Sequence, residues 1–390
     1  MKIVVLGAGG NTSPGANRYL AENDDVNEVV LADIDTEEVE RRARKLGDKA
    51  VSKYADVDDH GMLVDLFDDA DAVVNATVFY FNLQVMKACL EAKTNYVDLG
   101  GLFHTAKKQL DWDDKFREAG ITGIVGLGSA PGIVNVMARW AVDRLDTVRS
   151  INIRDGIVDF TERGVSFNAP YALDTLVDEF TTNAVVFEDG EFKEVPPFSG
   201  GEEVDYPEPV GTQTSYNTLH TEVYTLAKTF EDKGLKEVDF KLALPSEFER
   251  KLRFLIDLGF GKKDTIKVKE KEIKLVDVLK ELVSELKEPN EEIEPDDHKV
   301  LRVDVEGEKD DKVTQHRLES LISPMKKYGL SCGQLSVGGP AGIAAWMMSK
   351  GIIEKKGFMP PEQCIEPETF FEEMAKWDMQ VYHSTKQAIP

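Results

Sequence analysis

The stretch KIVVLGAGGNTSPG, residues 2–15, decides the fold of this chain. Its opening apolar, β-branched run predicts a buried strand, and Gly7-Ala8-Gly9 begins the G-x-G-x-x-G turn of dinucleotide-binding folds. The third glycine of that turn would stand at position 12, where the sequence has Thr12. Ser13 is a favoured N-cap and Pro14 a favoured first helical residue. The stretch predicts a nucleotide loop with an altered helix start; the alternative is an ordinary glycine-rich turn.

Strand and helix signals alternate from this loop to about residue 127. The predicted strands cover 3–6, 28–32, 49–57, 71–75, 96–98 and 121–127, and the predicted helices 14–22, 36–46, 60–67, 83–92 and 107–118. Such alternation is typical of an α/β fold in which helices cover both faces of a parallel sheet. We therefore expect a Rossmann domain with a doubly wound parallel sheet over residues 1–130.

The pattern changes after Val148. Strands are predicted at 150–158, 299–305 and 316–322, a hairpin at 185–193, a long loop at 196–211 and helices at 275–286 and 341–348. This predicts a second α+β domain over residues 131–338 with a mostly antiparallel sheet. The remainder, 339–390, is expected to pack back on the Rossmann domain as helices.

Composition excludes several classes of protein. A formal net charge of −25 over 390 residues argues against nucleic acid or an anionic membrane as partner. The three cysteines are widely spaced and form no C-x-x-C pair, so we expect neither disulfides nor a metal site, and a cytoplasmic location. No run approaches the roughly 20 apolar residues that a membrane-spanning helix needs.

The loop and two later strand ends predict the cofactor site. Backbone donors at the start of the first helix would bind a pyrophosphate, and Asp33, at the end of the second strand, would bind the adenosine ribose. A carboxylate there repels a 2′-phosphate, which favours NAD, with NADP possible. Gly15 is expected to provide the close helix–strand contact. The predicted cofactor-binding residues are Gly7, Gly9, Gly10, Asn11, Thr12, Ser13, Asp33, Asn75 and Ala76.

Three further stretches carry a resemblance: YVDLGGLFH at 96–104, GSAPGIVN at 128–135 and GGPAGIAA at 338–345. Together with the N-terminal Gly-Ala-Gly-Gly, they resemble the saccharopine dehydrogenase family, particularly its lysine 6-dehydrogenase-like branch, to which carboxynorspermidine dehydrogenases are related. The resemblance implies nicotinamide-dependent redox chemistry at carbon–nitrogen bonds of lysine-derived amino acids, a second domain covering the cleft, and a homodimer. The loop departs from the family's usual G-x-G-G-x-G.

Three titratable residues are candidates for catalysis. Asp98 ends a predicted strand, where it could bind a substrate ammonium, accept its proton, or only cap the strand. His220 is the side chain type that titrates near neutrality, and Glu222 could pair with it or with an amine. Both would come from the second domain.

Substrate contacts are expected from two turns and one aromatic residue. Pro131 and Gly132 lie where backbone donors at a helix start could hold a carboxylate. The other candidates are Gly100, Gly101 and Tyr171.

The leading hypothesis is an NAD(P)-dependent oxidoreductase that transfers hydride at a C–N bond of a lysine-like or opine-type amino acid, with a small amino-acid or polyamine-like substrate as its partner. Reductive condensation of an amine with an aldehyde, as in carboxynorspermidine synthesis, is the alternative enzyme reaction. A nucleotide-binding sensor without catalysis is the alternative of another class.

Overall fold

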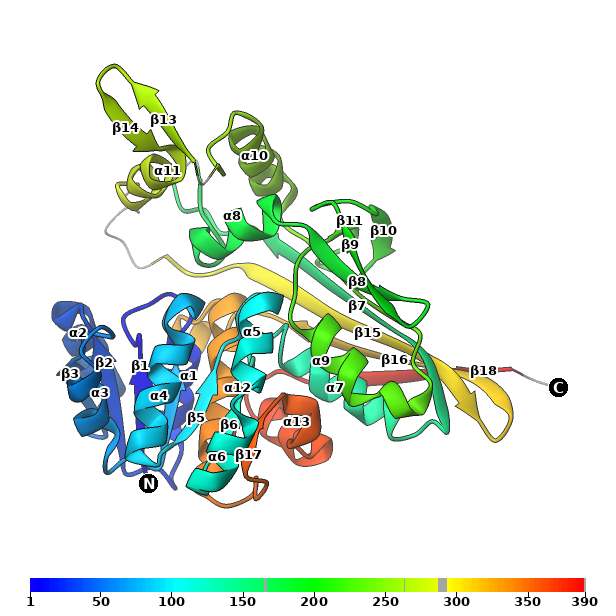
Figure 1. The fold of residues 1–390 in the computed structure, drawn as a ribbon, viewed down its shortest axis with the longest axis horizontal. Helices are drawn as coiled ribbons and strands as arrows, with labels where there is room; N and C mark the ends of the chain where they lie inside the picture. The colour runs from blue at the N-terminus through cyan, green and yellow to red at the C-terminus, as the bar shows by residue number, and fades with distance from the viewer. Residues whose placement is uncertain (165–166, 263, 287–292, 389–390) are drawn as a thin grey trace.

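A computed structural model describes residues 1–164, 167–262, 264–286 and 293–388, which form two large sheets and one separate two-stranded sheet (Figure 1). The first sheet contains β1 (Lys2–Leu6), β2 (Glu28–Asp33), β3 (Ala50–Tyr54), β4 (Ala72–Asn75), β5 (Asn95–Asp98), β6 (Thr122–Ile124) and β17 (Gly357–Met359). Its order is β17-β6-β5-β4-β1-β2-β3, and every pair of neighbours is parallel. This order confirms the doubly wound fold and places its reversal between β1 and β4, where such sheets bind dinucleotides.

The helices of this region connect and cover these strands. They are α1 (Pro14–Glu22), α2 (Thr36–Leu46), α3 (His60–Phe67), η1 (Phe79–Phe81), α4 (Asn82–Ala92), α5 (Phe103–Leu110) and α6 (Asp113–Ala119). The prediction of one helix over 107–118 is wrong, because α5 and α6 are separate helices. Asp111 and Trp112 lie between them.

The second sheet is mixed and mostly antiparallel, as predicted. Its strands are β7 (Thr147–Asp159), β8 (Ala184–Glu188), β9 (Glu191–Val195), β10 (Glu202–Asp205), β11 (Thr212–Asn217), β12 (Glu237–Ala243), β15 (Asp297–Lys309), β16 (Lys312–Ile322) and β18 (Tyr382–Gln387). The main order is β10-β11-β12-β7-β15-β16-β18, in which only β12 and β7 pair in parallel. Residues 196–211, predicted as a loop, contain β10.

The helices of the second region lie around this sheet. They are α7 (Ile133–Val142), α8 (Leu173–Thr181), α9 (Glu222–Thr229), η2 (Glu231–Lys233), α10 (Ser246–Asp257), α11 (Leu275–Ser284) and η3 (Lys326–Tyr328), and β13 (Thr265–Val268) pairs with β14 (Lys271–Lys274) in a separate hairpin. Apolar residues of β7 and β15, such as Ile153 and Val303, share one buried cluster with Ile3 and Val5 of β1. The two sheets are therefore joined by a continuous apolar core.

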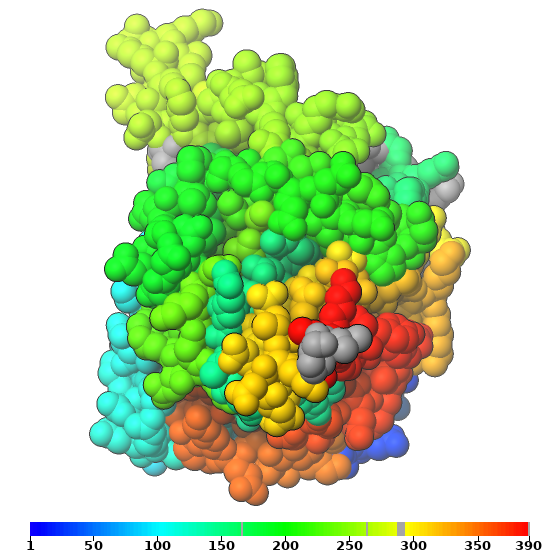
Figure 2. Space-filling view, turned by 90° about the vertical axis from the view of Figure 1, so that its right-hand side faces the viewer, coloured from blue at the N-terminus to red at the C-terminus, as the bar shows by residue number. Residues whose placement is uncertain are grey.

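The C-terminal segment contributes to both sheets. It contains α12 (Cys332–Ser349), β17, η4 (Pro361–Gln363), α13 (Pro367–Ala375) and β18. We predicted helices alone, but β17 extends the first sheet beside β6, and β18 pairs with β16 at the end seen in Figure 2. These strands are short and carry little periodic signal. The domain boundaries at residues 130 and 338 stay predictions.

Close packing between α1 and α12 explains why position 15 is a glycine. A Cβ atom at Gly15 would lie 2.2 Å from the carbonyl oxygen of Gln334 and 2.8 Å from the nitrogen of Gly339. The predicted helix–strand contact is therefore wrong, since Gly15 permits the approach of two helices. The small residues of the 338–345 motif lie at this contact, where Gly338 in turn approaches the Thr12 carbonyl.

A buried carboxyl group joins the C-terminal segment to the second region. Glu362 accepts hydrogen bonds from Asn135 Nδ2 at 2.9 Å and Thr229 Oγ1 at 3.3 Å. Burial raises the pKa of Glu362 from 4.5 to about 7, against the opposing effect of these hydrogen bonds.

This raised pKa predicts a pH-dependent stability. The folded protein binds the Glu362 proton more tightly than the unfolded chain does. The contribution of this proton to the free energy of unfolding is therefore fully present below pH 4.5 and is lost as the pH rises to about 7. The pKa difference corresponds to about 3 kcal/mol. Urea unfolding of wild type and Glu362→Gln between pH 4.5 and 8 should show a smaller decline in the variant. Glu231→Gln, at an exposed side chain, should behave as wild type. Equal declines in wild type and Glu362→Gln would contradict the assignment.

Candidate active site

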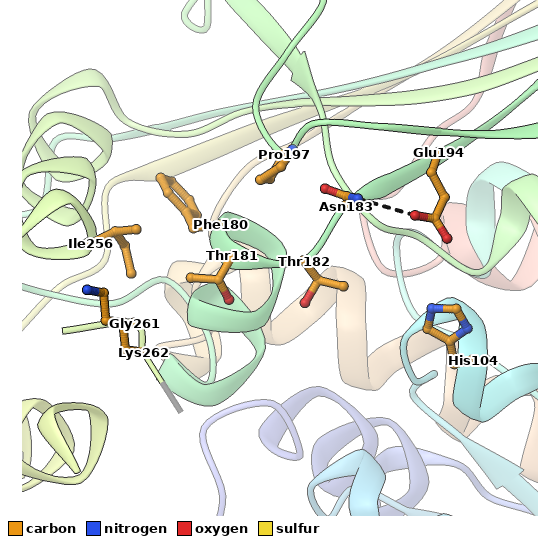
Figure 3. A pocket seen from close by; sticks show the side chains of 10 residues that line it. All are labelled: His104, Phe180, Thr181, Thr182, Asn183, Glu194, Pro197, Ile256, Gly261 and Lys262. Carbon is orange, nitrogen blue, oxygen red and sulfur yellow. Dashed lines mark hydrogen bonds between the residues drawn. The ribbon is translucent and has the colours of Figure 1, made fainter. Parts of the chain in front are cut away.

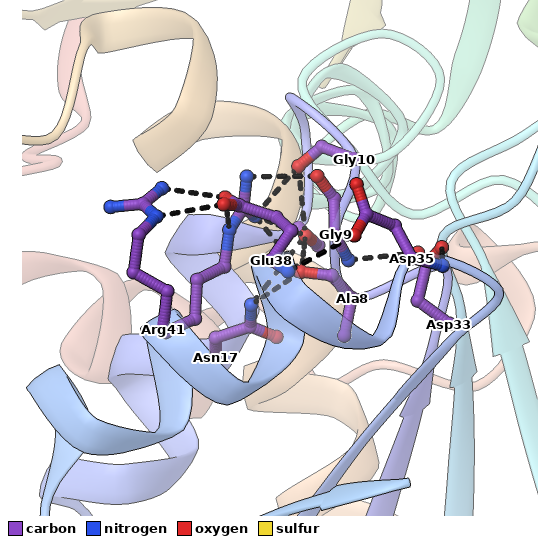
Figure 4. Close-up of polar contacts among 10 residues, drawn as sticks. Ala8, Gly9, Gly10, Asn17, Asp33, Asp35, Glu38 and Arg41 are labelled. Atoms are coloured by element: carbon purple, nitrogen blue, oxygen red, sulfur yellow. Dashed lines mark hydrogen bonds and ion pairs between the residues drawn. The ribbon is translucent and has the colours of Figure 1, made fainter. Parts of the chain in front are cut away.

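The β1–α1 loop makes the tight turn that its glycines allow (Figure 4). Gly7 has φ +78°, and a Cβ there would lie 2.8 Å from the Ala76 backbone at the end of β4. The Gly9 N–H donates to Asp33 Oδ2 at 2.8 Å, and the Gly10 N–H donates to the Gly7 carbonyl at 3.0 Å. The loop is thus held against the ends of β2 and β4.

The start of α1 fits the phosphates of a dinucleotide. Among the hydrogen bonds of the described residues, the backbone N–H groups of Asn11, Thr12 and Ser13 have no acceptor. Unpaired donors at the N-terminus of a nine-residue helix form a ready anion site, because the helix dipole adds to their effect. Pro14 is the first helical residue, as predicted.

Ser13 does not cap this helix with its side chain. Its backbone is already helical, and its hydroxyl donates to the carbonyls of Ala8 at 2.8 Å and Gly10 at 3.0 Å. The predicted N-cap is therefore wrong. The hydroxyl instead stabilises the loop through hydrogen bonds to the carbonyls of the loop itself.

Asp33 and Asn75 also make internal hydrogen bonds. Besides its bond from Gly9, Asp33 accepts the Asp35 N–H through Oδ1 at 3.0 Å. Asn75 is buried, accepts from the Thr77 hydroxyl at 2.6 Å and donates to Tyr96 OH at 3.1 Å. The Asn75 side chain thus shapes the turn after β4, while Asp33 remains partly exposed at the loop.

Asp98 is enclosed beneath the loops that follow β5 and β6. Its donors are the N–H groups of Gly100 and Gly126 to Oδ1, and Asn82 Nδ2, Tyr96 OH and Gln109 Nε2 to Oδ2. Burial raises the pKa of Asp98, and the hydrogen bonds oppose that rise. Asp98 is fully buried and both of its oxygens are already occupied by donors of the chain, which supports the strand-capping alternative, and its catalytic role stays a prediction.

The turns that follow β5 and β6 are packed around Pro131. A Cβ at Gly100 (φ +106°) would lie 2.8 Å from Pro131 Cγ, and one at Gly132 (φ +132°) would lie 2.1 Å from the Gly128 carbonyl oxygen. The Gly101 carbonyl accepts a hydrogen bond from the Thr221 hydroxyl of the second region. The turn after β5 therefore contacts the start of α9, and the substrate-binding role of these turns stays a prediction.

Five titratable side chains meet on the side of the second sheet that faces these turns; we call them the cleft cluster. They are Asp155 on β7, Glu179 on α8, His220 and Glu222 at the start of α9, and Lys299 on β15. His220 Nδ1 lies 3.2 Å from Glu222 Oε1, and its Nε2 lies 3.4 Å from Glu179 Oε1. Lys299 Nζ lies 3.3 Å from Asp155 Oδ2. With both basic groups protonated, two positive charges face three carboxylates.

Two further contacts fix the position of this cluster. Lys299 Nζ donates to Ser129 Oγ at 3.1 Å, just after β6, and Tyr171 OH donates to Glu179 Oε2. The cluster therefore lies at the carboxyl end of the first sheet, where substrates meet cofactors in α/β folds.

His220 is cationic rather than poised near neutrality. Burial lowers its pKa, but Glu222 and Glu179 outweigh burial and raise it to about 10. The predicted titration near pH 7 is thus corrected. At neutral pH, the imidazolium lies between the carboxylates of Glu222 and Glu179 as an ion-pair partner, and it stacks on Phe240 with ring centroids 3.7 Å apart.

Several carboxylate oxygens in the cluster have no donor. Both oxygens of Glu222 and Oδ1 of Asp155 are buried and accept no hydrogen bond from any residue that the structure describes. The His220–Glu222 contact is therefore an ion pair without hydrogen-bond geometry. Buried carboxylate oxygens without donors are rare in native proteins, and they suit a ligand that carries N–H groups.

An open groove of about 660 Å³ is lined by ten residues, none of which belongs to the cleft cluster (Figure 3). Helix α8 gives Glu179 to the cluster, whereas Phe180 and Thr181 of the same helix line the groove. Asn183 and Glu194 hydrogen-bond to each other at 3.2 Å in its wall. The groove holds none of the unpaired carboxylates, so we place the chemistry in the cluster.

Within residues 1–164, 167–262, 264–286 and 293–388, no helix has the length and apolar character needed to cross a bilayer. Over the same described residues, no three His, Cys, Asp or Glu side chains are grouped as metal ligands.

A dinucleotide loop at the carboxyl end of a doubly wound sheet, with buried titratable side chains at the same end, is the arrangement expected of an NAD(P)-dependent oxidoreductase. Residues 3–124 match the family model "Saccharopine dehydrogenase NADP binding domain", and residues 128–379 match "Saccharopine dehydrogenase C-terminal domain". The chain belongs to the saccharopine dehydrogenase family, which confirms the resemblance found in the sequence.

Named relatives and a solved structure agree with this assignment. The chain is 27% identical to carboxynorspermidine synthase of Vibrio alginolyticus over 288 residues, 68% of each chain. It is 27% identical to carboxyaminopropylagmatine dehydrogenase of Synechocystis over 294 residues, 73% of this chain and 72% of the relative. Saccharopine dehydrogenase (L-Glu forming) of Saccharomyces cerevisiae superposes with a TM-score of 0.75 at 18% identity, covering 99% of both chains, which shows the same fold.

Proposed function

We propose that this enzyme transfers hydride at the C–N bond of a secondary amine that joins an amino-acid part to a polyamine-like part. The observation that carries the proposal is the set of buried carboxylate oxygens on Glu222 and Asp155 that accept no hydrogen bond from any described residue. A protonated amine carries both the N–H donors and the positive charge that such oxygens bind. The two curated relatives act on carboxylated polyamine-type compounds by name, which supports this substrate class.

The residues of the chain have distinct proposed roles. A nicotinamide held by the β1–α1 loop would supply the hydride acceptor or donor for the carbon next to nitrogen. Glu222 binds the ammonium and takes the proton that nitrogen loses as the imine forms, and water then splits the imine into an amine and a carbonyl compound. In the reverse direction, the same steps condense an aldehyde with an amine. Lys299, beside Ser129, is positioned to hold the amino-acid carboxylate.

Oxidation of a lysine-like primary amine is the second candidate, since the same carboxylates could hold its ammonium. For the cofactor, Asp33 supports NAD over NADP, because its carboxylate lies at the loop where a 2′-phosphate would be repelled. The homodimer and the cytoplasmic location stay predictions.

A substrate screen tests the proposal. The purified enzyme is supplied with NAD⁺ or NADP⁺ and with carboxynorspermidine, saccharopine or lysine, and formation of the reduced cofactor is followed by absorbance. We expect turnover of carboxynorspermidine-type amines, and of an aldehyde with a diamine in the presence of reduced cofactor. Turnover of lysine alone would favour the second candidate. Cofactor binding without turnover of any amine would contradict both and favour a sensor.

A further inference from the structure

One arginine contacts all three carbonyls of the Ala8-Gly9-Gly10 turn. The guanidinium of Arg42, on α2, donates through Nη1 to the carbonyls of Ala8 at 2.9 Å and Gly10 at 2.8 Å, and through Nη2 to Gly9 at 2.9 Å. Nη1 also lies 3.1 Å from Ser13 Oγ. The planar arrangement of guanidinium donors permits this set of contacts, which a lysine ammonium cannot reproduce.

Glu38 fixes this arginine in place. Its Oε1 accepts from Arg42 Nε at 2.5 Å, while the neighbouring Arg41 binds both Glu38 oxygens, at 2.8 and 2.7 Å (Figure 4). Arg41 is about half exposed, whereas the Arg42 side chain is 16% exposed. The two arginines therefore share one carboxylate, but only Arg42 has hydrogen bonds to the glycine loop.

The contacts between Arg42 and the loop carbonyls also fix the directions of the N–H groups in the same peptide units. In a trans peptide, the C=O and the following N–H point in opposite directions. The Gly10 carbonyl points at Arg42, so the Asn11 N–H points away from it, and this N–H is one of the three unpaired donors at the start of α1.

We propose that Arg42 is a positioning residue for the cofactor: it fixes the loop that lacks the third glycine so that the Asn11 N–H faces the pyrophosphate. This role requires cofactor binding but not the substrate proposed above, so the failure of one leaves the other testable.

Binding measurements on three variants test the role of Arg42. Arg42→Met removes the contacts, Arg42→Lys keeps the charge without the planar donors, and Arg41→Met is the matched control. Titration calorimetry gives the Kd for NAD⁺, NADP⁺, ADP and adenosine, and thermal unfolding monitors folding. Adenosine lacks the phosphates, so it reports on the adenosine site alone.

We expect Arg42→Met to raise the Kd for NAD⁺ and ADP, and the KM for the cofactor, at least about tenfold with little change in kcat. The Kd for adenosine should stay within about twofold. Arg42→Lys should rescue only part of the loss, and Arg41→Met should bind as wild type.

Any one of four results would overturn the proposal. Three of them are an unchanged Kd for NAD⁺ in folded Arg42→Met or Arg42→Lys, an equal loss of affinity for adenosine and ADP, and an equal loss in Arg41→Met. A loss confined to NADP⁺ would identify Arg42 as a 2′-phosphate ligand and would also overturn it.

Discussion

Glu222→Gln is expected to lower kcat/KM for the amine substrate about 100-fold or more while the Kd of the cofactor stays unchanged. The amide keeps the size of the side chain but loses the negative charge that balances the ammonium and the capacity to accept its proton. The carboxylate is fully buried, and no residue in the described part of the chain donates a hydrogen bond to it, so the substitution removes its charge without breaking a hydrogen bond of the fold. Steady-state kinetics and a titration with reduced cofactor measure the two quantities separately.

A matched variant separates this effect from a general effect of removing charge. Glu231→Gln changes an exposed carboxylate close to the same helix and should leave kcat/KM within about twofold of wild type. Folding of both variants is monitored by thermal unfolding. Wild-type kcat/KM in folded Glu222→Gln would exclude Glu222 from the reaction.

Gly132→Ala is expected to lower the free energy of unfolding by about 3 kcal/mol or more. The new Cβ would lie 2.1 Å from the oxygen and 2.4 Å from the nitrogen of Gly128, and the backbone has φ +132°, which side chains other than glycine rarely adopt. These atoms belong to the backbone and cannot move aside easily, because the Gly128 N–H donates a hydrogen bond across the turn to the Pro131 carbonyl at 2.8 Å. Urea unfolding measures the loss.

Gly120→Ala provides the control for backbone strain alone. Gly120 has φ +74° at the C-terminus of α6, and a Cβ there would meet no atom within 4 Å. We expect a loss of about 1 kcal/mol. Equal losses at the two positions would show that the collision with Gly128 contributes nothing.

Elements with strong local signals could be predicted closely from the sequence. Helix α1 spans 14–22, as its proline start predicted, and the hairpin at 185–193 turns at Asp189 and Gly190, both with positive φ. Strands β10, β17 and β18 were missed for a physical reason. They are short, and they are fixed by partners distant in the sequence rather than by their own periodicity.

The candidate site was only partly predictable for a related reason. Asp98 was expected to face a substrate because it ends a strand, but Asn82 and Gln109, on two other elements, enclose it. Such burial leaves no trace in the local pattern. His220 and Glu222 are adjacent in space, as their spacing allowed.

Asp155 and Lys299 were missed, although the sequence held a usable signal. Asp155 continues the alternating positions of Ile151 and Ile153 on β7, and Lys299 continues those of Leu301 on β15. A charged residue on the apolar side of a predicted strand breaks the alternation that buries that side. Both charges lie in the cleft cluster because that side of the sheet faces the chemistry.

The C-terminal segment is synthesised last, and this determines when the first sheet can be completed. When residues 1–130 leave the ribosome, six strands of the first sheet are available, but β17 and the helix that packs on α1 are not. Gly15 and Ala16 therefore remain uncovered until α12 emerges more than 200 residues later. The first sheet is thus completed by β17 only after eight strands of the second sheet, β7 to β12, β15 and β16, have been made, and β18 of the second sheet follows still later. A ribosome that stops before residue 332 releases a chain whose first sheet has an unpaired edge at β6 and an exposed apolar face.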